Sequence, residues 1–91
     1  MVEVKKSKIH GKGLFSTKKI SKGTLIGTCE VVKTKKPNDY TLWVNGKNYD
    51  VVCDLKYINH SDKPNVAYYD DFTVMALKNI KAGKELTHKY E

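Results

Sequence analysis

Two short segments, far apart in the chain, carry residue types that suit ligand binding. Gly11 and Gly13 lack side chains at alternate positions, so backbone N–H and C=O groups there can approach a ligand closely. Asn59 offers two amide donors and a carbonyl acceptor, and the imidazole ring of His60 can donate and accept. Taken alone, each segment favours a structural turn, because Asn and Ser side chains also bond to their own backbone.

The stretches of sequence that must position these residues mostly show patterns typical of β-strands. Asn45 and Gly46 both tolerate positive φ and separate two apolar stretches, which strongly indicates a tight β-hairpin turn. Asp70-Asp71 separates a second pair of stretches in the same way. The predicted strands cover residues 2–4, 24–32, 40–44, 47–52, 65–69 and 72–77.

Helical signals are weak throughout the chain. No stretch carries an apolar stripe of helical period over three turns, and only residues 54–57 are predicted to form a single turn. Residues 33–39 are predicted to be an exposed loop. Two glycines, Gly23 and Gly83, each follow an isoleucine by three positions and precede a strand, as in a repeated turn. The sequence therefore predicts a mainly β fold of small curled sheets.

The 91 residues carry a formal net charge of +7, and that charge is unevenly distributed. Residues 1–36 hold ten lysines and two acids, whereas residues 37–91 hold seven lysines and eight acids. A basic N-terminal face can attract nucleic acid or an acidic partner. All seventeen basic residues are lysine, and guanine readout mostly uses arginine, so sequence-specific DNA binding is not predicted. Most of these lysines are expected to solvate the surface.

The sequence also bears on compartment and metal content. It has no apolar run of about 20 residues and no secretion signal, which predicts a cytoplasmic protein and leaves open export of a host-directed effector by another route. Cys29 and Cys53 lie in apolar, strand-like contexts and are expected to be buried thiols. Two cysteines and three scattered histidines lack zinc-site spacing, so no metal is predicted.

Three segments, taken in order, resemble the SET domain, the fold of one large class of protein lysine methyltransferases. They are residues 9–15 (Ile-His-Gly-Lys-Gly-Leu-Phe), residues 59–65 (Asn-His-Ser-Asp-Lys-Pro-Asn) and residues 80–90, which end in Tyr90. The resemblance covers most of the chain and is thinnest between residues 33 and 55. It implies a single SET domain over residues 1–91, with a C-terminal pseudoknot that brings Tyr90 to the methyl group of S-adenosylmethionine.

The resemblance also assigns roles to individual residues. Tyr90 is the implied catalytic tyrosine, orienting the target lysine amine of a protein substrate. A channel for that lysine is implied at Tyr40, Tyr68 and His88. The implied cofactor-binding residues are His10, Lys12 and Gly13 through their backbone, Asn59 through side chain and backbone, His60 beside the adenine, and Lys56, where arginine is common.

Departures from the family pattern qualify this expectation. Asp62 replaces a cysteine that often binds zinc, which again predicts no metal. His88 replaces a phenylalanine or tyrosine, Lys89 replaces an acid, and the helical insertion before Lys56 is nearly absent. The chain ends one residue after Tyr90, so closure of the site by a second subunit, and hence a homodimer, is one expectation. The alternative is a non-catalytic SET-like module whose basic face binds an acidic partner or nucleic acid.

Overall fold

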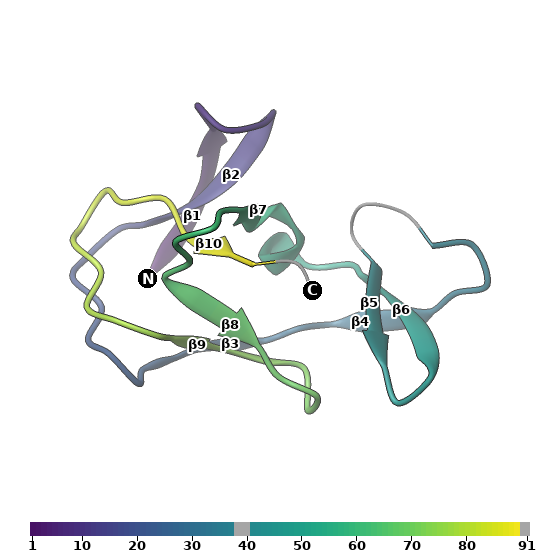
Figure 1. Ribbon diagram of the computed structural model, residues 1–91. Coiled ribbons are helices and arrows are strands. Elements are labelled where there is room, and N and C mark those ends of the chain that lie inside the picture. The colour runs from purple at the N-terminus through teal and green to yellow at the C-terminus, as the bar shows by residue number, and fades with distance from the viewer. Residues whose placement is uncertain (38–40, 90–91) are drawn as a thin grey trace.

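The computed structural model describes residues 1–37 and 41–89, which form short strands and one helical turn (Figure 1). The strands belong to four small sheets, with strand orders β1-β2, β10-β7, β3-β9-β8 and β4-β6-β5. The elements are β1 (Val2–Lys6), β2 (Lys12–Ser16), β3 (Leu25–Thr28), β4 (Val31–Lys33), β5 (Thr41–Val44), β6 (Lys47–Val51), the 3-10 helix η1 (Asp54–Tyr57), β7 (Asn59–His60), β8 (Val66–Tyr68), β9 (Thr73–Ala76) and β10 (Thr87–His88). The expected fold of small β-sheets is confirmed.

The first two strands form a hairpin that also holds the end of the chain. β1 and β2 pair antiparallel, with Val4 opposite Leu14. The outer edge of β2 then pairs with the segment before β10, because Leu86 N–H donates to the Leu14 carbonyl at 2.8 Å and Ser16 N–H donates to the Lys84 carbonyl at 2.9 Å. Strand β2 was not among the strands predicted from the sequence, because it contains Gly13 and follows Gly11, and glycine is uncommon in strands.

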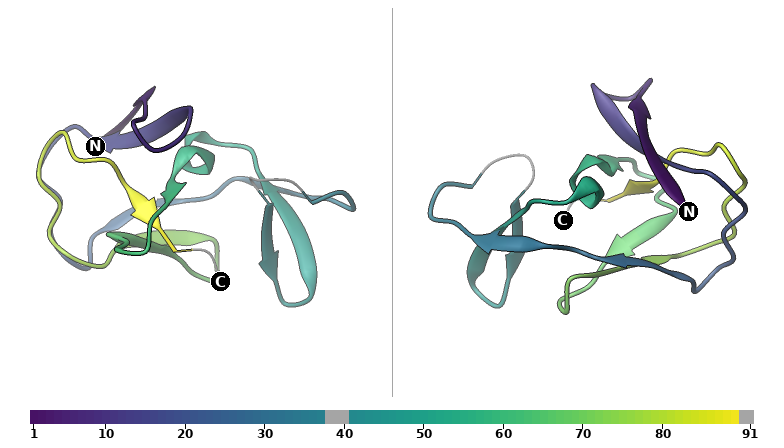
Figure 2. Two further views of the ribbon diagram at one scale, coloured as in Figure 1. Left: turned by 45° about the horizontal axis from the view of Figure 1, so that its top comes forward. Right: turned by 180° about the vertical axis from the view of Figure 1, so that it is seen from behind.

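The C-terminal segment passes between two parts of the chain that precede it. On one side β10 runs parallel to β7, with Thr87 opposite Asn59 and His88 opposite His60. On the other side Asn65 N–H donates to the Thr87 carbonyl at 3.1 Å. Residues 59–65 therefore flank β10 on both edges, which is the pseudoknot that the family resemblance implied (Figures 1 and 2).

The structure contains both copies of the repeated glycine turn, and the two copies pair with each other. Ile20 and Ile80 form an isolated antiparallel bridge, with both N–H···O=C bonds at 2.8 Å. Gly23 and Gly83 follow with φ of 84° and 82°, a region that other residues rarely adopt. Ile20 and Ile80 are both 2% exposed, so the two turns meet across the core.

Both hairpins predicted from the sequence are confirmed. Asn45 and Gly46 have φ of 51° and 77° and connect β5 to β6, as a tight primed turn requires. The second hairpin connects β8 to β9, but its left-handed residue is Phe72, with φ of 66°, rather than an aspartate. The predicted helical turn is η1. Of the predicted loop 33–39, Lys33 belongs to β4, and residues 38 and 39 lie outside the described part.

One predicted strand is wrong. The apolar run 24–32 is two strands, β3 and β4, which pair with β9 and β6 in different sheets. The break falls at Cys29 and Glu30, where Cys29 N–H donates to the Phe72 carbonyl at 2.7 Å. Both cysteines are free thiols, but only Cys29 is buried; Cys53 is partly exposed, so the prediction of a buried thiol is wrong there. Burial, followed by the neighbouring Cys53, raises the pKa of Cys29 to about 12. Cys29 is therefore an inert core residue.

Candidate active site

The side-chain amide of Asn59 holds together the two segments that the sequence analysis singled out. Its Nδ2 donates to the carbonyl oxygens of His10 and Lys12, each at 3.1 Å. Two further acceptors surround the same nitrogen, Glu85 Oε2 at 2.9 Å and Ser7 Oγ at 3.2 Å. Two amide hydrogens are shared among four oxygens, which fixes the orientation of the amide and turns its Oδ1 away from them.

Glu85 and Ser7 lie at the centre of this network, and the sequence analysis had given neither a role. Ser7 Oγ donates to the Glu85 carboxylate, with both oxygens at 2.9 Å, and accepts from Ile9 N–H at 2.9 Å. The two residues are 78 positions apart, so no local pattern could have paired them. The only available signal was Glu85 itself, a carboxylate in the third family-like segment.

Gly13 is required by the same network. A Cβ built at Gly13 would collide with the Glu85 carboxylate and lie 3.0 Å from Ser7 Cβ. Close packing of the carboxylate against bare backbone, rather than an unusual φ, is therefore the reason for glycine here. The close neighbour of Gly13 in the structure is the Glu85 side chain, and the predicted approach of a ligand to this backbone stays a prediction.

Asn65 clamps the segment that leads to the C-terminus. Its Nδ2 donates to the Glu85 carbonyl at 2.9 Å, and its Oδ1 accepts from Thr87 N–H at 2.8 Å. Asn65 is 7% exposed and thus makes backbone-like bonds to two residues of the same segment inside the protein. The clamp therefore fixes the path of residues 85–87 at the start of β10.

The two lysines of the predicted cofactor set both lie near the ring of Tyr57. Lys56 Nζ is 5.1 Å and Lys12 Nζ is 5.9 Å from the centroid of the Tyr57 ring. Both distances suit a cation–π contact. The neighbouring residue His60 is exposed, with its Nε2 3.4 Å from the Asp62 carboxylate. Asn59 and His60 lie on β7, Lys56 lies on η1, Lys12 and Gly13 lie on β2, and His10 lies in the turn before β2. The side-chain amide of Asn59 joins β7 to this turn and to the start of β2 through the carbonyls of His10 and Lys12.

Two of the predicted channel residues, Tyr68 on β8 and His88 on β10, are in contact. The rings of Tyr68 and His88 pack edge to face, with centroids 4.8 Å apart, and Tyr68 Oη donates to the Leu55 carbonyl at 2.6 Å. Both rings line a hollow of about 730 Å³ that β5 also borders. The third predicted channel residue, Tyr40, and the predicted catalytic residue, Tyr90, lie outside the described part of the chain. Their roles stay predictions.

The environment of His88 keeps its ring neutral. The side chain is buried, and this burial, followed by the nearby His60, lowers the pKa of His88 to about 4 from its usual 6.5. A neutral ring in edge-to-face contact with Tyr68 adds no positive charge to the hollow at physiological pH.

The pKa of His88 predicts a dependence of stability on pH. Between about pH 6.5 and pH 4 the unfolded chain protonates this histidine while the folded protein does not, so acidification favours unfolding over that window. We expect His88→Phe, which retains a ring against Tyr68, to lose less of its melting temperature between pH 6.5 and 4.5 than the parent protein does. His10→Gln, at an exposed histidine, should behave like the parent. Identical declines in the parent and His88→Phe would contradict a neutral buried ring.

Two further observations concern metal-ligand clusters and membrane-spanning helices in the described part of the chain. Among residues 1–37 and 41–89, no three His, Cys, Asp or Glu side chains come together as metal ligands. In the same part of the chain, no helix has the length and apolar character needed to span a membrane.

Comparison with known proteins agrees with this architecture. The model of the SET domain family matches residues 37–91, more than half of the chain, and the chain therefore belongs to the SET domain family. A relative is the variant-silencing SET domain-containing protein of Plasmodium falciparum (isolate 3D7), 28% identical over 121 aligned positions. The alignment covers 98% of this chain and only 5% of that protein.

A solved structure shares the fold. It is that of a candidate histone methyltransferase from Plasmodium falciparum, with a TM-score of 0.80 over 99% of this chain and 92% of the other. The sequence identity is 24%, so the likeness concerns the arrangement of the backbone.

Proposed function

We propose that this chain is the SET domain of a protein lysine methyltransferase, formed as a single unit by residues 1–91, and that it transfers a methyl group from S-adenosylmethionine to a lysine of a protein substrate. The observation that carries the proposal is the position of Asn59. Its amide bonds to the carbonyls of His10 and Lys12, and its strand pairs with β10, three residues before Tyr90. Three segments that are separate in sequence thereby meet around one residue.

The residues around Asn59 fit the polar groups of the cofactor. Because four acceptors hold Nδ2, Oδ1 is turned outward and can accept a hydrogen bond from an ammonium group. Lys12 and Lys56 supply positive charge for a carboxylate. Ser61 N–H donates to the His88 carbonyl, so the alternating backbone groups of His60 face the other edge of β7, where an adenine can bind.

When bound, the cofactor supplies a methyl group on a positively charged sulfur. The chain must then present a neutral lysine amine in line with that methyl group. Deprotonating a lysine of pKa about 10.4 at pH 7.5 costs about 4 kcal/mol. A hollow lined by Tyr68 and neutral His88 disfavours the ammonium form by desolvation. Alignment of the reacting groups can contribute about 7–11 kcal/mol.

Tyr90 is assigned the orienting role by the family resemblance, and its replacement tests the proposal directly. We expect Tyr90→Phe to bind S-adenosylhomocysteine within about threefold of the parent protein and to lose at least about 90% of methyl transfer from labelled cofactor. The loss follows because the hydroxyl orients the amine, and a misplaced nucleophile forfeits much of the alignment term.

A matched control keeps this test specific. Tyr49→Phe removes a hydroxyl from a tyrosine that packs edge to face on Phe72, with ring centroids 5.0 Å apart, and should leave both activities unchanged. No cofactor binding by calorimetry, together with no transfer to a panel of basic proteins and peptides, would refute the proposed function.

A further inference from the structure

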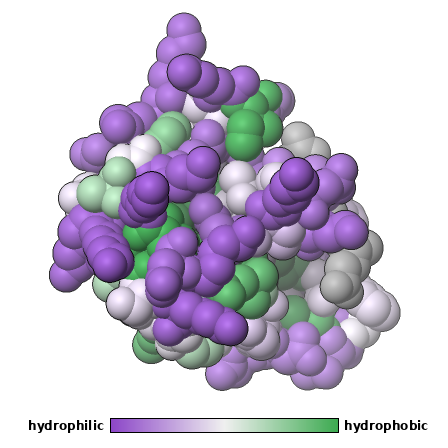
Figure 3. Space-filling view, turned by 60° about the vertical axis from the view of Figure 1, so that its left-hand side comes forward, coloured by the Kyte–Doolittle hydropathy of each residue, from purple (hydrophilic) through white to green (hydrophobic). Residues whose placement is uncertain are grey.

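A large hollow on the molecule lies outside the predicted cofactor and channel residues. It encloses about 1180 Å³ between the β1–β2 hairpin and the segment that joins β9 to β10. None of the six predicted cofactor residues and neither of the described channel residues lines it. We call this hollow the lysine groove. Figure 3 shows this side of the molecule, where hydrophilic side chains surround apolar atoms.

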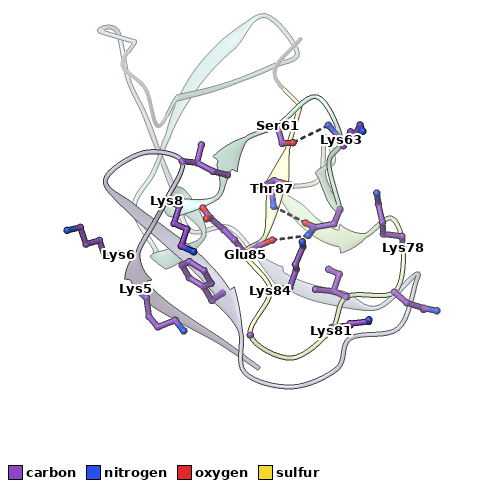
Figure 4. Close-up of a pocket in the computed structure, with 16 residues that line it drawn as sticks. Lys5, Lys6, Lys8, Ser61, Lys63, Lys78, Lys81, Lys84, Glu85 and Thr87 are labelled. Carbon is purple, nitrogen blue, oxygen red and sulfur yellow. Dashed lines mark hydrogen bonds between the residues drawn. The ribbon is translucent and has the colours of Figure 1, made fainter.

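The rim of the groove is strongly basic because two distant parts of the chain contribute to it. One bank is β1 with its turn, and the other is the segment after β9, with the turn after β7 between them. Seven lysines line the groove, all of them exposed: Lys5, Lys6, Lys8, Lys63, Lys78, Lys81 and Lys84 (Figure 4).

Little negative charge offsets these lysines. Among the described residues that line the groove, Glu85 is the one acidic residue, which gives this lining a net charge of +6. Its carboxylate accepts hydrogen bonds from Ser7 and Asn59. Among the lining lysines in the described part of the chain, the one ion pair recorded is between Lys5 and Glu3, at 3.5 Å. A concave surface with this charge focuses a positive potential into the groove.

We infer that the lysine groove binds the phosphate backbone of duplex nucleic acid, independently of base sequence. Ammonium groups on both banks suit an extended polyanion, whose binding is driven by release of condensed counterions and requires charge more than geometry. The chain has no arginine, and lysine commonly binds phosphate as a point charge without bidentate geometry.

The groove favours a duplex over a single strand. Binding of single strands relies on aromatic rings on which successive bases stack. Within residues 1–37 and 41–89, Phe15 is the one aromatic residue that lines the groove, and Lys5 Nζ covers its ring at 4.7 Å from the centroid. A stacking platform is therefore missing from the lining, while the phosphate-binding lysines are present.

The test is fluorescence anisotropy with labelled 20-base-pair DNA duplexes of two unrelated sequences, in about 50–250 mM NaCl and without cofactor. Both duplexes should bind with similar affinity. If about five lysines contact phosphates, the slope of log affinity against log salt should be about −4.5. A parent protein that fails to bind either duplex at 50 mM salt, or that prefers the single strand, would overturn the inference.

Two triple variants, each of which removes three lysines, distinguish an effect of the groove lysines from an effect of the protein's overall charge. Lys78→Ala/Lys81→Ala/Lys84→Ala removes one bank and should weaken binding at 100 mM salt at least tenfold, with a slope smaller by about 2–3. Lys33→Ala/Lys35→Ala/Lys47→Ala, at exposed positions on β4, β6 and the intervening loop, should change affinity less than twofold. Equal losses in both variants would show that charge anywhere suffices and would overturn the inference.

The opposite bank provides a second variant in case the first is unstable. Lys6→Glu/Lys8→Glu should weaken duplex binding more than Lys35→Glu/Lys36→Glu does, with circular dichroism confirming that each variant is folded. Poly-glutamate should displace the duplex only at about tenfold or higher charge concentration; equal displacement would assign the groove to acidic peptides instead.

The inference stands apart from the proposed methyl transfer. Saturating S-adenosylhomocysteine should leave duplex affinity within twofold, because the predicted cofactor residues do not line the groove. Competition between the two would place the duplex in the cofactor site and overturn the inference. A protein that binds duplex but transfers no methyl group would refute the proposed function and leave the groove assignment intact.

Discussion

Asn59→Asp is expected to destabilise the protein by about 4 kcal/mol, more than Asn59→Ala, at about 2–3 kcal/mol. Alanine removes the donor shared by Glu85, Ser7 and two backbone carbonyls, and hydrogen bonds to charged groups contribute about 1.5–3 kcal/mol. Aspartate has nearly the same shape but places a second carboxylate beside Glu85, and two such charges repel by about 1–4 kcal/mol at close range. Urea unfolding at pH 7.5 measures both free energies.

This result depends on which atom of the amide faces the four acceptors. Asn79→Asp is the matched control, because Asn79 Oδ1 accepts from Lys22 N–H at 2.8 Å, a bond that a carboxylate preserves. We expect that variant to lie within about 0.5 kcal/mol of the parent. If Asn59→Asp proved no less stable than Asn59→Ala, the amide would be oriented the other way, and the fit of Oδ1 to a ligand ammonium would be lost with it.

Gly13→Ala is expected to cost about 2–3 kcal/mol, and Glu85→Ala should recover part of that loss. The added methyl group would lie 2.9 Å from the Glu85 carboxyl carbon, and the carboxylate cannot move without giving up its bonds to Ser7 and Asn59. In the Glu85→Ala background the obstacle is absent. A double-mutant cycle by urea unfolding should therefore give a sub-additive coupling of at least about 1 kcal/mol.

Gly27→Ala is the control for the glycine substitution. A Cβ there would lie 3.3 Å from Leu55 Cδ1, the flexible end of a side chain, so we expect a cost below about 1 kcal/mol. Strictly additive costs for Gly13→Ala and Glu85→Ala would show that the carboxylate is not what requires glycine at this position. We also expect Gly13→Ala to bind the cofactor more weakly. The Glu85 carboxylate that the added methyl group would displace bonds to Asn59, and Asn59 bonds to the carbonyls of His10 and Lys12.

Local chemistry allowed much of the fold to be predicted. The Asn45-Gly46 turn and the glycine turns at Gly23 and Gly83 follow from backbone preferences within a few residues, and each has the expected positive φ. The run 24–32 was predicted wrongly as one strand, because its division depends on distant partners: β3 pairs with β9 and β4 pairs with β6. Local propensity cannot report which sheet a strand joins.

The candidate site divides in the same way. The Gly-x-Gly segment, the Asn-His pair and the C-terminal segment are recognisable from residue type and order, and they identify the family. The partners that hold them together, Ser7 and Glu85, stand 78 residues apart and gain their roles only through the pairing of β2 with the end of the chain. Their hydrogen bonds depend on Å-scale placement, which residue type alone does not specify.

Charge shows the contrast most clearly. The amino-acid sequence by itself determined that the chain is basic, that its basic residues are all lysine and that the N-terminal part carries the excess. Only the tertiary structure decided that Lys63, Lys78, Lys81 and Lys84, from the nearly neutral remainder, face the N-terminal lysines across one groove. The physical reason is that a potential adds up over distances in space, and folding, rather than position in the chain, sets those distances.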